Sequence, residues 1–382
     1  MPSLHRCTAP LQPAQRCCIA ARARLRCRRA AGCCDDGLFL SYCRAPDGAI
    51  NSSITEAFTV KRFILIFAVA VLAFGCLTAC GKGGKSDDGK LKIVATIFPE
   101  YDWVRCILGD NPAGAEITLM LDSGVDLHSF QPTAEDILKI ANCDVFIYVG
   151  GESDSWVEDA LRNAVNKNRV VINLLETLGD RVKEEELVEG MECETEEDEE
   201  EEGPEYDEHV WLSLKNAAYL VDKIAKAICK VDMDNAVVYT ENAKAYVEKL
   251  NALDASYKAA VDAASVKTLL FGDRFPFRYL TDDYDLKYYA AFVGCSAETE
   301  ASFETIAFLA KKVDECSLKA VMTIEGTDRR IAETIVQNTA SKDQKILTLD
   351  SMQSVTSADV KKGVSYLSIM ESNLAVLKEA LQ

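Results

Sequence analysis

The sequence predicts an α/β protein made of two lobes with mostly parallel sheets, joined by one long rigid helix. Two observations predict this class. Apolar runs of strand length alternate with segments of helical periodicity in both halves of the chain, which is typical of parallel sheets covered by helices. Between these regions, residues 234–264 keep a helical pattern without proline or glycine. About thirty helical residues extend roughly 45 Å, enough to run along both lobes.

The first lobe is expected at residues 91–180. Its strands are predicted at the apolar runs Leu91–Phe98, Ala115–Leu121, Asp144–Gly150 and Val170–Leu174. Its helices are predicted at Tyr101–Leu108, from Thr133 onward, and at Ser155–Val165. Thr133 is the expected N-cap of the second helix because Asp136 follows three residues later, in a variant of the capping box.

The second lobe is expected at residues 266–382, after a helix at Leu214–Cys229 and the long helix. Its strands are predicted at Lys267–Phe271, Tyr288–Phe292, Ala320–Ile324 and Lys345–Leu349, with Gly272–Tyr279 as a loop that leads into a helix. Three of these strands end at or near a carboxylate, namely Asp273, Glu325 and Asp350. Ligands of parallel sheets bind beyond the carboxyl ends of the strands, so these carboxylates are candidate ligands.

The N-terminal segments have the pattern of a targeting signal rather than of a folded domain. Residues 60–80 combine Lys61 and Arg62 with a short apolar run and the ending Leu-Thr-Ala-Cys-Gly, the pattern of a bacterial lipoprotein signal whose Cys80 carries the lipid. A single membrane anchor is the alternative. Residues 81–90 are the expected flexible tether. Residues 1–59 are interpreted as a non-native extension caused by a misassigned start.

Charge and cysteine content exclude several classes of protein. The chain carries a formal net charge of −19, of which residues 1–79 contribute +6 and the rest −25. This acidic body argues against a nucleic-acid partner and is compatible with cation binding. Seven of the 15 cysteines fall in residues 1–43, and the others have no CxxC pair. The spacing therefore indicates neither a zinc ribbon nor a disulfide scaffold.

Residues 181–208 form an acidic insert, whose densest part is Glu196–Glu202. Its acidic residues leave little apolar surface to bury, so we expect it to be disordered. Two interpretations stay open: a solubilising loop, or a loop that collects cations at the mouth of a metal site. Residues 209–265 complete the first lobe and form the linking helix.

The chain has only three histidines, and two of them lie in distinctive settings. His128 follows a predicted strand of the first lobe, in Gly-Val-Asp-Leu-His-Ser-Phe-Gln-Pro-Thr. His209 follows the acidic insert, in Asp-Glu-His-Val-Trp-Leu-Ser. Imidazole is the commonest metal-binding side chain. A lone histidine is more often an ordinary surface or capping residue, but two near strand ends and carboxylates are candidate metal ligands.

Residues 91–382 resemble the metal-binding receptors of bacterial ABC importers for zinc and manganese. The two histidine stretches, together with the lipoprotein signal upstream, carry this resemblance. The resemblance implies two α/β lobes joined by a long rigid helix, with the metal between the lobes. It also implies ligands at His128, His209, a third position at the start of the second lobe, and Asp350.

The third position departs from the pattern of the family. Where those receptors have histidine or glutamate, direct alignment places Gly272, which has no side chain to ligate a metal. Arg274 cannot replace it because a guanidinium has no acceptor, although Arg274 can pair with a buried carboxylate. We expect Asp273 to be the third ligand, with water, Glu300 or Glu325 as alternatives.

The expected function is capture rather than catalysis. A lipid-anchored monomer on the extracytoplasmic face of the cell membrane binds a divalent metal ion and presents it to an ABC permease. Zn²⁺ is favoured, with Mn²⁺ as the alternative. Two rivals remain: a surface adhesin without a transport role, and a zinc hydrolase, which would need an open coordination position and a general base.

Overall fold

The computed structural model describes residues 89–162, 165–191, 205–296 and 300–382. The predicted N-terminal extension, the signal peptide with Cys80 and most of the tether lie outside the described residues, as does the densest part of the acidic insert. Among the described residues, no helix has the length and apolar character needed to cross a membrane.

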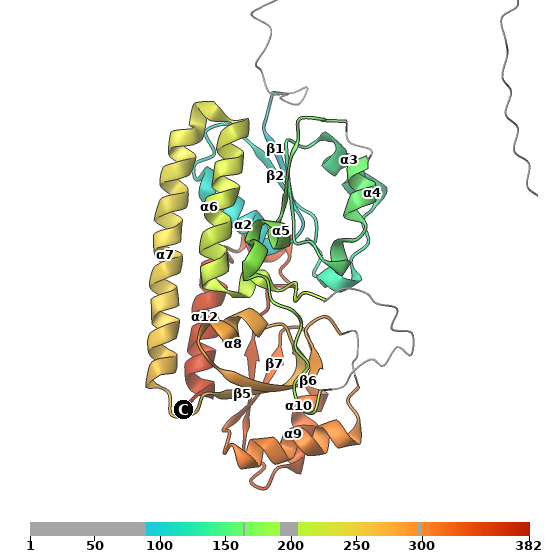
Figure 1. The fold of residues 1–382 in the computed structure, drawn as a ribbon, viewed down its shortest axis with the longest axis vertical. Coiled ribbons are helices and arrows are strands. Elements are labelled where there is room, and N and C mark those ends of the chain that lie inside the picture. Colours follow the sequence, from blue (N-terminus) through green and yellow to red (C-terminus); the bar gives the residue numbers. More distant parts are fainter. Residues whose placement is uncertain (1–88, 163–164, 192–204, 297–299) are drawn as a thin grey trace, which may run out of the picture. The chain divides into compact units, whose positions relative to one another are not determined.

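The described part of the chain contains two four-stranded parallel sheets (Figure 1). The first has the order β2-β1-β3-β4, from β1 (Lys92–Ala95), β2 (Glu116–Leu119), β3 (Val145–Tyr148) and β4 (Val170–Asn173). The second has the order β6-β5-β7-β8, from β5 (Thr268–Phe275), β6 (Lys287–Val293), β7 (Ala320–Ile324) and β8 (Lys345–Leu349). The predicted fold class is confirmed.

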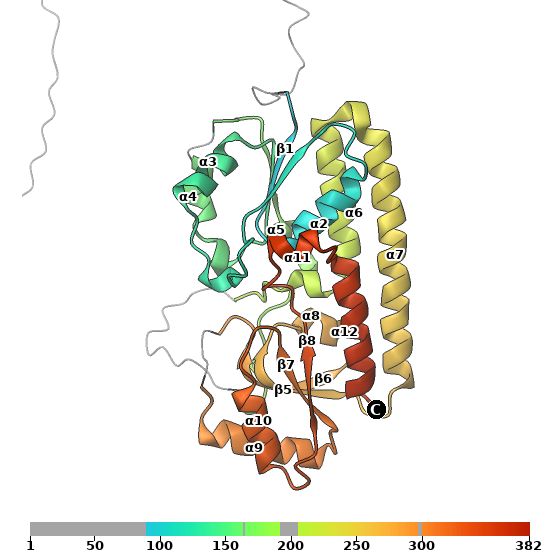
Figure 2. The same ribbon diagram turned by 180° about the vertical axis from the view of Figure 1, so that it is seen from behind.

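Helices cover both faces of the first sheet. On one side lie α2 (Phe98–Leu108), α5 (Leu174–Leu178) and α6 (Leu214–Val231), and on the other α3 (Ala134–Asn142) and α4 (Val157–Arg162) (Figures 1 and 2). The predicted capping box of α3 is present, because Thr133 accepts a hydrogen bond from the Asp136 backbone and Asp136 accepts one from Thr133. Pro99 lies in the first turn of α2, where proline is tolerated.

The second sheet is covered by α9 (Phe303–Glu315) and α10 (Arg330–Asn338) on one face. Near the other face lie the short α8 (Arg278–Asp283) and α12 (Tyr366–Ala380), and α11 (Ser357–Lys361) precedes α12 (Figure 2). A small core lies under α9 and α10, where Leu270, Phe292 and Ala332 are buried.

The long helix is α7 (Ala236–Ala263), which packs against α2 and α6 of the first lobe and α12 of the second (Figure 1). Its buried residues are Tyr239, Ala243, Tyr246, Leu250, Tyr257 and Val261. Tyr257 donates a hydrogen bond to the Met370 carbonyl of α12. One apolar core extends from the first sheet to the near face of the second, so the lobes are joined by buried side chains as well as by α7.

Two segments differ from their sequence predictions. Gly272–Phe275 was expected to be a loop, but it continues β5 past an irregularity between Phe271 and Arg274 and pairs again with β6. The ends of the predicted disordered insert pair with each other, since Glu184 forms an antiparallel bridge with Tyr206 and Asp207 donates to the Lys183 carbonyl. Backbone hydrogen bonding orders these ends despite their charge.

Candidate metal centre

His128 and His209 meet at the carboxyl ends of the first lobe's strands. Their Nε2 atoms lie 3.2 Å apart, although 81 residues separate them in sequence. His128 belongs to a short turn of 3₁₀ helix, Leu127–Ser129, whose N-cap Asp126 accepts the His128 backbone N–H. His209 directly precedes a second such turn, Val210–Leu212, and its side chain is fully buried.

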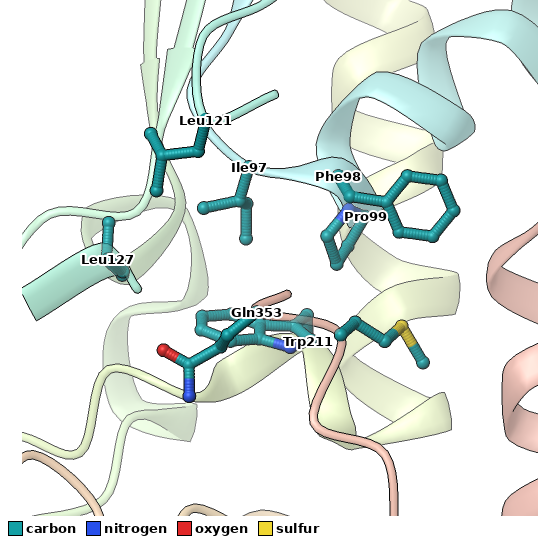
Figure 3. Close-up of a pocket in the computed structure, with 8 residues that line it drawn as sticks. Ile97, Phe98, Pro99, Leu121, Leu127, Trp211 and Gln353 are labelled. Carbon is teal, nitrogen blue, oxygen red and sulfur yellow. The ribbon is translucent and has the colours of Figure 1, made fainter. Parts of the chain in front are cut away.

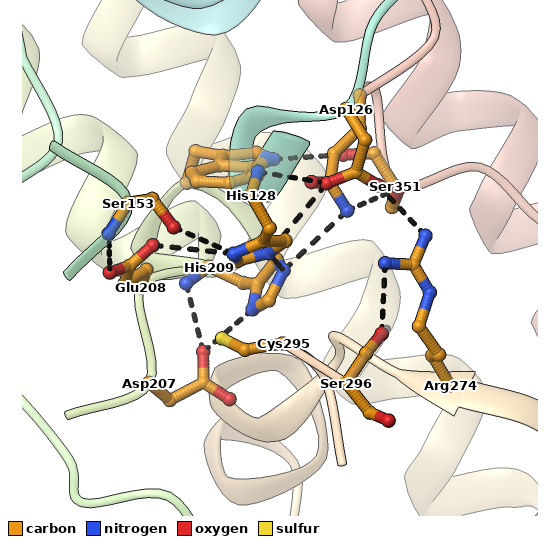
Figure 4. A network of polar contacts seen from close by, with 12 residues as sticks. Asp126, His128, Ser153, Asp207, Glu208, His209, Arg274, Cys295, Ser296 and Ser351 are labelled. Atoms are coloured by element: carbon orange, nitrogen blue, oxygen red, sulfur yellow. Dashed lines mark hydrogen bonds and ion pairs between the residues drawn. The ribbon is translucent and has the colours of Figure 1, made fainter. Parts of the chain in front are cut away.

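Each imidazole is held through its other nitrogen (Figure 4). His209 Nδ1 lies 3.1 Å from Asp207 Oδ1, and His128 Nδ1 lies 2.7 Å from Ser153 Oγ. A carboxylate accepts only, so the Asp207 contact places a proton on Nδ1 of His209. Fixing one nitrogen in this way leaves the other to bind a metal.

The two histidines differ in their preferred charge. Burial and the neighbouring His209 lower the pKa of His128 to about 3. Burial opposes the charged form of His209 as well, but Asp207 and Glu208 outweigh it and raise the pKa of His209. We infer that, without metal, one proton shared by the facing Nε2 atoms resides mainly on His209. A divalent cation can take the place of this proton.

A third metal-binding group joins this pair. Among the described residues, His128, His209 and Cys295 form one group in which one ring nitrogen of each histidine and the Cys295 sulfur lie within 4.8 Å of one another (Figure 4). Cys295 follows the end of β6 by two residues. Burial and the carboxylates of Glu185 and Asp207 raise the pKa of its thiol. Cys295 was not among the ligands predicted from sequence, because a single cysteine without a spaced partner forms no motif.

The predicted ligands Asp273 and Asp350 are not members of this group. Both oxygens of Asp273 accept hydrogen bonds within the second lobe, from the Arg274 backbone on one side and from Ile324 and Thr327 on the other. Oδ1 of Asp350 accepts the Met352 backbone N–H. These two carboxylates therefore organise their own loops.

The other positions considered for the third ligand are also outside the group. Glu325 accepts hydrogen bonds from Ser351 and Gln353 through both oxygens, and Glu300 is exposed. Gly272 cannot be replaced by a larger residue without a shift, because an added Cβ would lie 2.6 Å from the Cα of Ala332. Close packing of β5 against α10 therefore accounts for the glycine at this position.

Arg274 connects the two lobes beside the histidines. Its Nη2 donates to Asp126 Oδ2 at 2.8 Å, and its Nη1 donates to the Ser296 carbonyl at 3.3 Å. Arg274 thus pairs with a carboxylate, although Asp126 is half-buried rather than buried as expected. Asp126 also holds the His128 backbone, so this ion pair fixes the His128 turn relative to the second lobe.

A small, mostly apolar pocket lies next to the histidines (Figure 3). Ile97, Leu121 and Leu127 line it from the first lobe, and Trp211 and Gln353 line it from the opposite side. The Trp211 indole donates to the Ser351 carbonyl, and Tyr366 donates to the Trp211 carbonyl. These contacts hold the His209 segment against an apolar wall.

Two α/β lobes are joined by a long helix, and two imidazoles face each other between them. This arrangement is that of a binding protein that holds its ligand between two lobes. The family profile for "Zinc-uptake complex component A periplasmic" matches residues 93–380. The chain belongs to this family.

Individual relatives agree with this assignment. The zinc-binding lipoprotein AdcA of Streptococcus pneumoniae is 33% identical over 324 residues, covering 84% of this chain and 61% of the relative. The chain thus spans about three fifths of that relative's length. The high-affinity zinc uptake system protein ZnuA of Bacillus subtilis is 30% identical, covering 84% of this chain and 98% of the relative. The Zn(II)-bound ZnuA-like domain of S. pneumoniae AdcA has a TM-score of 0.60 at 29% identity, covering 77% of this chain and 99% of the domain.

The hydrogen bonds that Asp273 accepts are expected to stabilise the second lobe. In Asp273→Asn, an amide NH₂ must face donors that now face a carboxylate, so we expect the free energy of unfolding to fall by about 1–3 kcal/mol while zinc binding is retained. Urea unfolding and a competitive zinc titration measure the two effects. The exposed turn variant Asp110→Asn is the control. Zinc affinity lost in Asp273→Asn without loss of stability would identify Asp273 as a ligand instead.

Proposed function

We propose that this protein is an extracytoplasmic receptor that captures Zn²⁺ between its lobes and delivers it to an ABC permease. The observation that carries the proposal is the pair of Nε2 atoms 3.2 Å apart. Two nitrogens bound to one tetrahedral zinc, each about 2.0–2.1 Å from the metal, lie about 3.3 Å apart. The metal-free spacing therefore already suits zinc.

The relatives support the same cargo, since AdcA and ZnuA are named for zinc binding and zinc uptake. We propose Zn²⁺ rather than Mn²⁺ because manganese prefers oxygen ligands, whereas the group at this site offers two nitrogens and a sulfur. We further propose that a lipid on Cys80 attaches the protein to the membrane and that the protein is a monomer.

The site is built for binding rather than for hydrolysis. Two buried carboxylates lie beside the histidines: Asp207, 3.1 Å from His209 Nδ1, and Glu208, which has one oxygen that accepts the Ser153 backbone N–H and another 3.6 Å from His128 Nδ1. Both Glu208 and Asp207 thus contact the back of an imidazole ring. Such contacts orient metal ligands.

Removing an imidazole tests the site directly. We expect His128→Ala to weaken zinc binding more than about a hundredfold, because replacing groups that merely orient metal ligands already costs about 10–100-fold. Competitive titration against a zinc chelator measures the affinity, and Ser129→Ala, an exposed neighbour in the same turn, is the control. Unchanged zinc affinity in His128→Ala would contradict the proposal, and absence of zinc binding by the wild type would favour the adhesin alternative.

Zinc binding should also depend on pH. The pKa of His209 is raised above its usual value of 6.5. As the pH falls, His209 therefore becomes protonated at a higher pH than an ordinary histidine. A protonated imidazole cannot bind metal. Below this pKa we expect at least a tenfold loss of zinc affinity per pH unit. Titrations between about pH 8 and about pH 5 measure this, and a constant affinity over that range would contradict the assignment of His209.

A further inference from the structure

The turn after β6 brings a cysteine to the histidine pair. Gly294 and Cys295 form this turn, and the Cys295 sulfur lies within 4.8 Å of one ring nitrogen of His128 and one of His209. The Cys295 backbone N–H donates to Glu185 Oε1 at 3.3 Å. Glu185 belongs to the ordered end of the acidic insert, so the turn is held by a segment that also leads to His209.

Gly294 allows this turn to approach the site. A Cβ at this position would lie 2.9 Å from Cε1 of His209 and 3.0 Å from the Phe275 carbonyl. Both distances are too short for ordinary carbon contacts. The backbone before Cys295 therefore packs directly against the His209 ring, and only glycine fits without a shift of its neighbours.

Other polar side chains near His128 and His209 form hydrogen bonds or ion pairs with other groups. Arg274 has no acceptor atom and is held by Asp126 and Ser296. The oxygens of Asp273 and Glu325 accept hydrogen bonds from their own loops. Among the described residues, Cys295 is the group that completes a three-ligand set.

We propose that Cys295 is the third metal ligand of this chain and takes the role that a histidine or glutamate side chain at the start of the second lobe fills in related receptors. This inference rests on the proposed function, because it names a ligand of the same metal site. On binding, the S–H bond of Cys295 breaks, the proton leaves to solvent, and the sulfur donates an electron pair to Zn²⁺. No change of oxidation state is involved.

The distances suit this role. Zinc bonds of about 2.3 Å to sulfur and about 2.0–2.1 Å to nitrogen place sulfur and nitrogen about 3.6 Å apart in a tetrahedral site. In the structure the sulfur and one ring nitrogen of each histidine lie within 4.8 Å of one another, so a contraction of roughly 1 Å brings them to the spacing of a tetrahedral site. A thiolate also favours zinc over manganese, because soft ligands select zinc.

Cobalt(II) reports a sulfur ligand by its near-ultraviolet sulfur-to-metal charge-transfer absorption. The experiment adds one equivalent of Co²⁺ to the full chain as wild type, Cys295→Ser, Cys295→Ala and the control Cys316→Ser, which removes a cysteine outside the group. We expect the absorption in the wild type and Cys316→Ser and a large loss of it in both Cys295 variants. Zinc affinity should fall more than tenfold in the Cys295 variants only.

Two results would overturn the inference. Equal absorption in the wild type and Cys295→Ser, or equal zinc affinity, would exclude Cys295 as a ligand while leaving the proposed function intact. A wild type that binds neither Co²⁺ nor Zn²⁺ would remove both proposals. The wild-type spectrum does not depend on any variant, and thermal unfolding of the metal-free variants identifies a loss of affinity caused by misfolding.

Discussion

Two imidazole nitrogens, one from the buried His209 and one from the half-buried His128, face each other at 3.2 Å, and the surrounding structure depends on holding them there. Such a contact is unfavourable between two lone pairs and becomes favourable when a proton or a metal ion lies between them. Asp207 and Ser153 fix the outer nitrogens, so neither ring can turn away easily. A site held in this way is organised before the metal arrives, which reduces the loss of conformational entropy on binding.

The supporting contacts come from both lobes. Trp211 is buried beside His209 and is bonded to the loop of Ser351 and to Tyr366 of α12. Arg274 joins the Asp126 loop to the second lobe. An isolated bridge pairs Ser123 with Thr356 across the same boundary. These contacts and the packing of α7 against both lobes define one geometry in which His128 and His209 meet.

Much of the fold followed from sequence because its signals are local. Alternating strand and helix patterns predicted both sheets, and the capping residues of α3 were identified from Thr133 and Asp136. The proposed third ligand, Cys295, did not follow, because its proximity to the histidines depends on contacts between distant segments. Nothing local to Asp273 shows that Ile324 and Thr327 occupy its oxygens. A single cysteine without a spaced partner carries no motif, so Cys295 became visible only when the fold placed it beside the histidines. Gly272 was predicted to lie in a loop, whereas β5 continues past it and packs closely against Ala332.

We propose that zinc is held by two imidazoles and a thiolate between the lobes. X-ray absorption at the zinc K-edge of the zinc-loaded protein tests it most directly. The account predicts a first shell with nitrogen at about 2.0–2.1 Å and one sulfur at about 2.3 Å, with the sulfur contribution lost in Cys295→Ser. A first shell of oxygen and nitrogen only, in the wild-type protein, would contradict it.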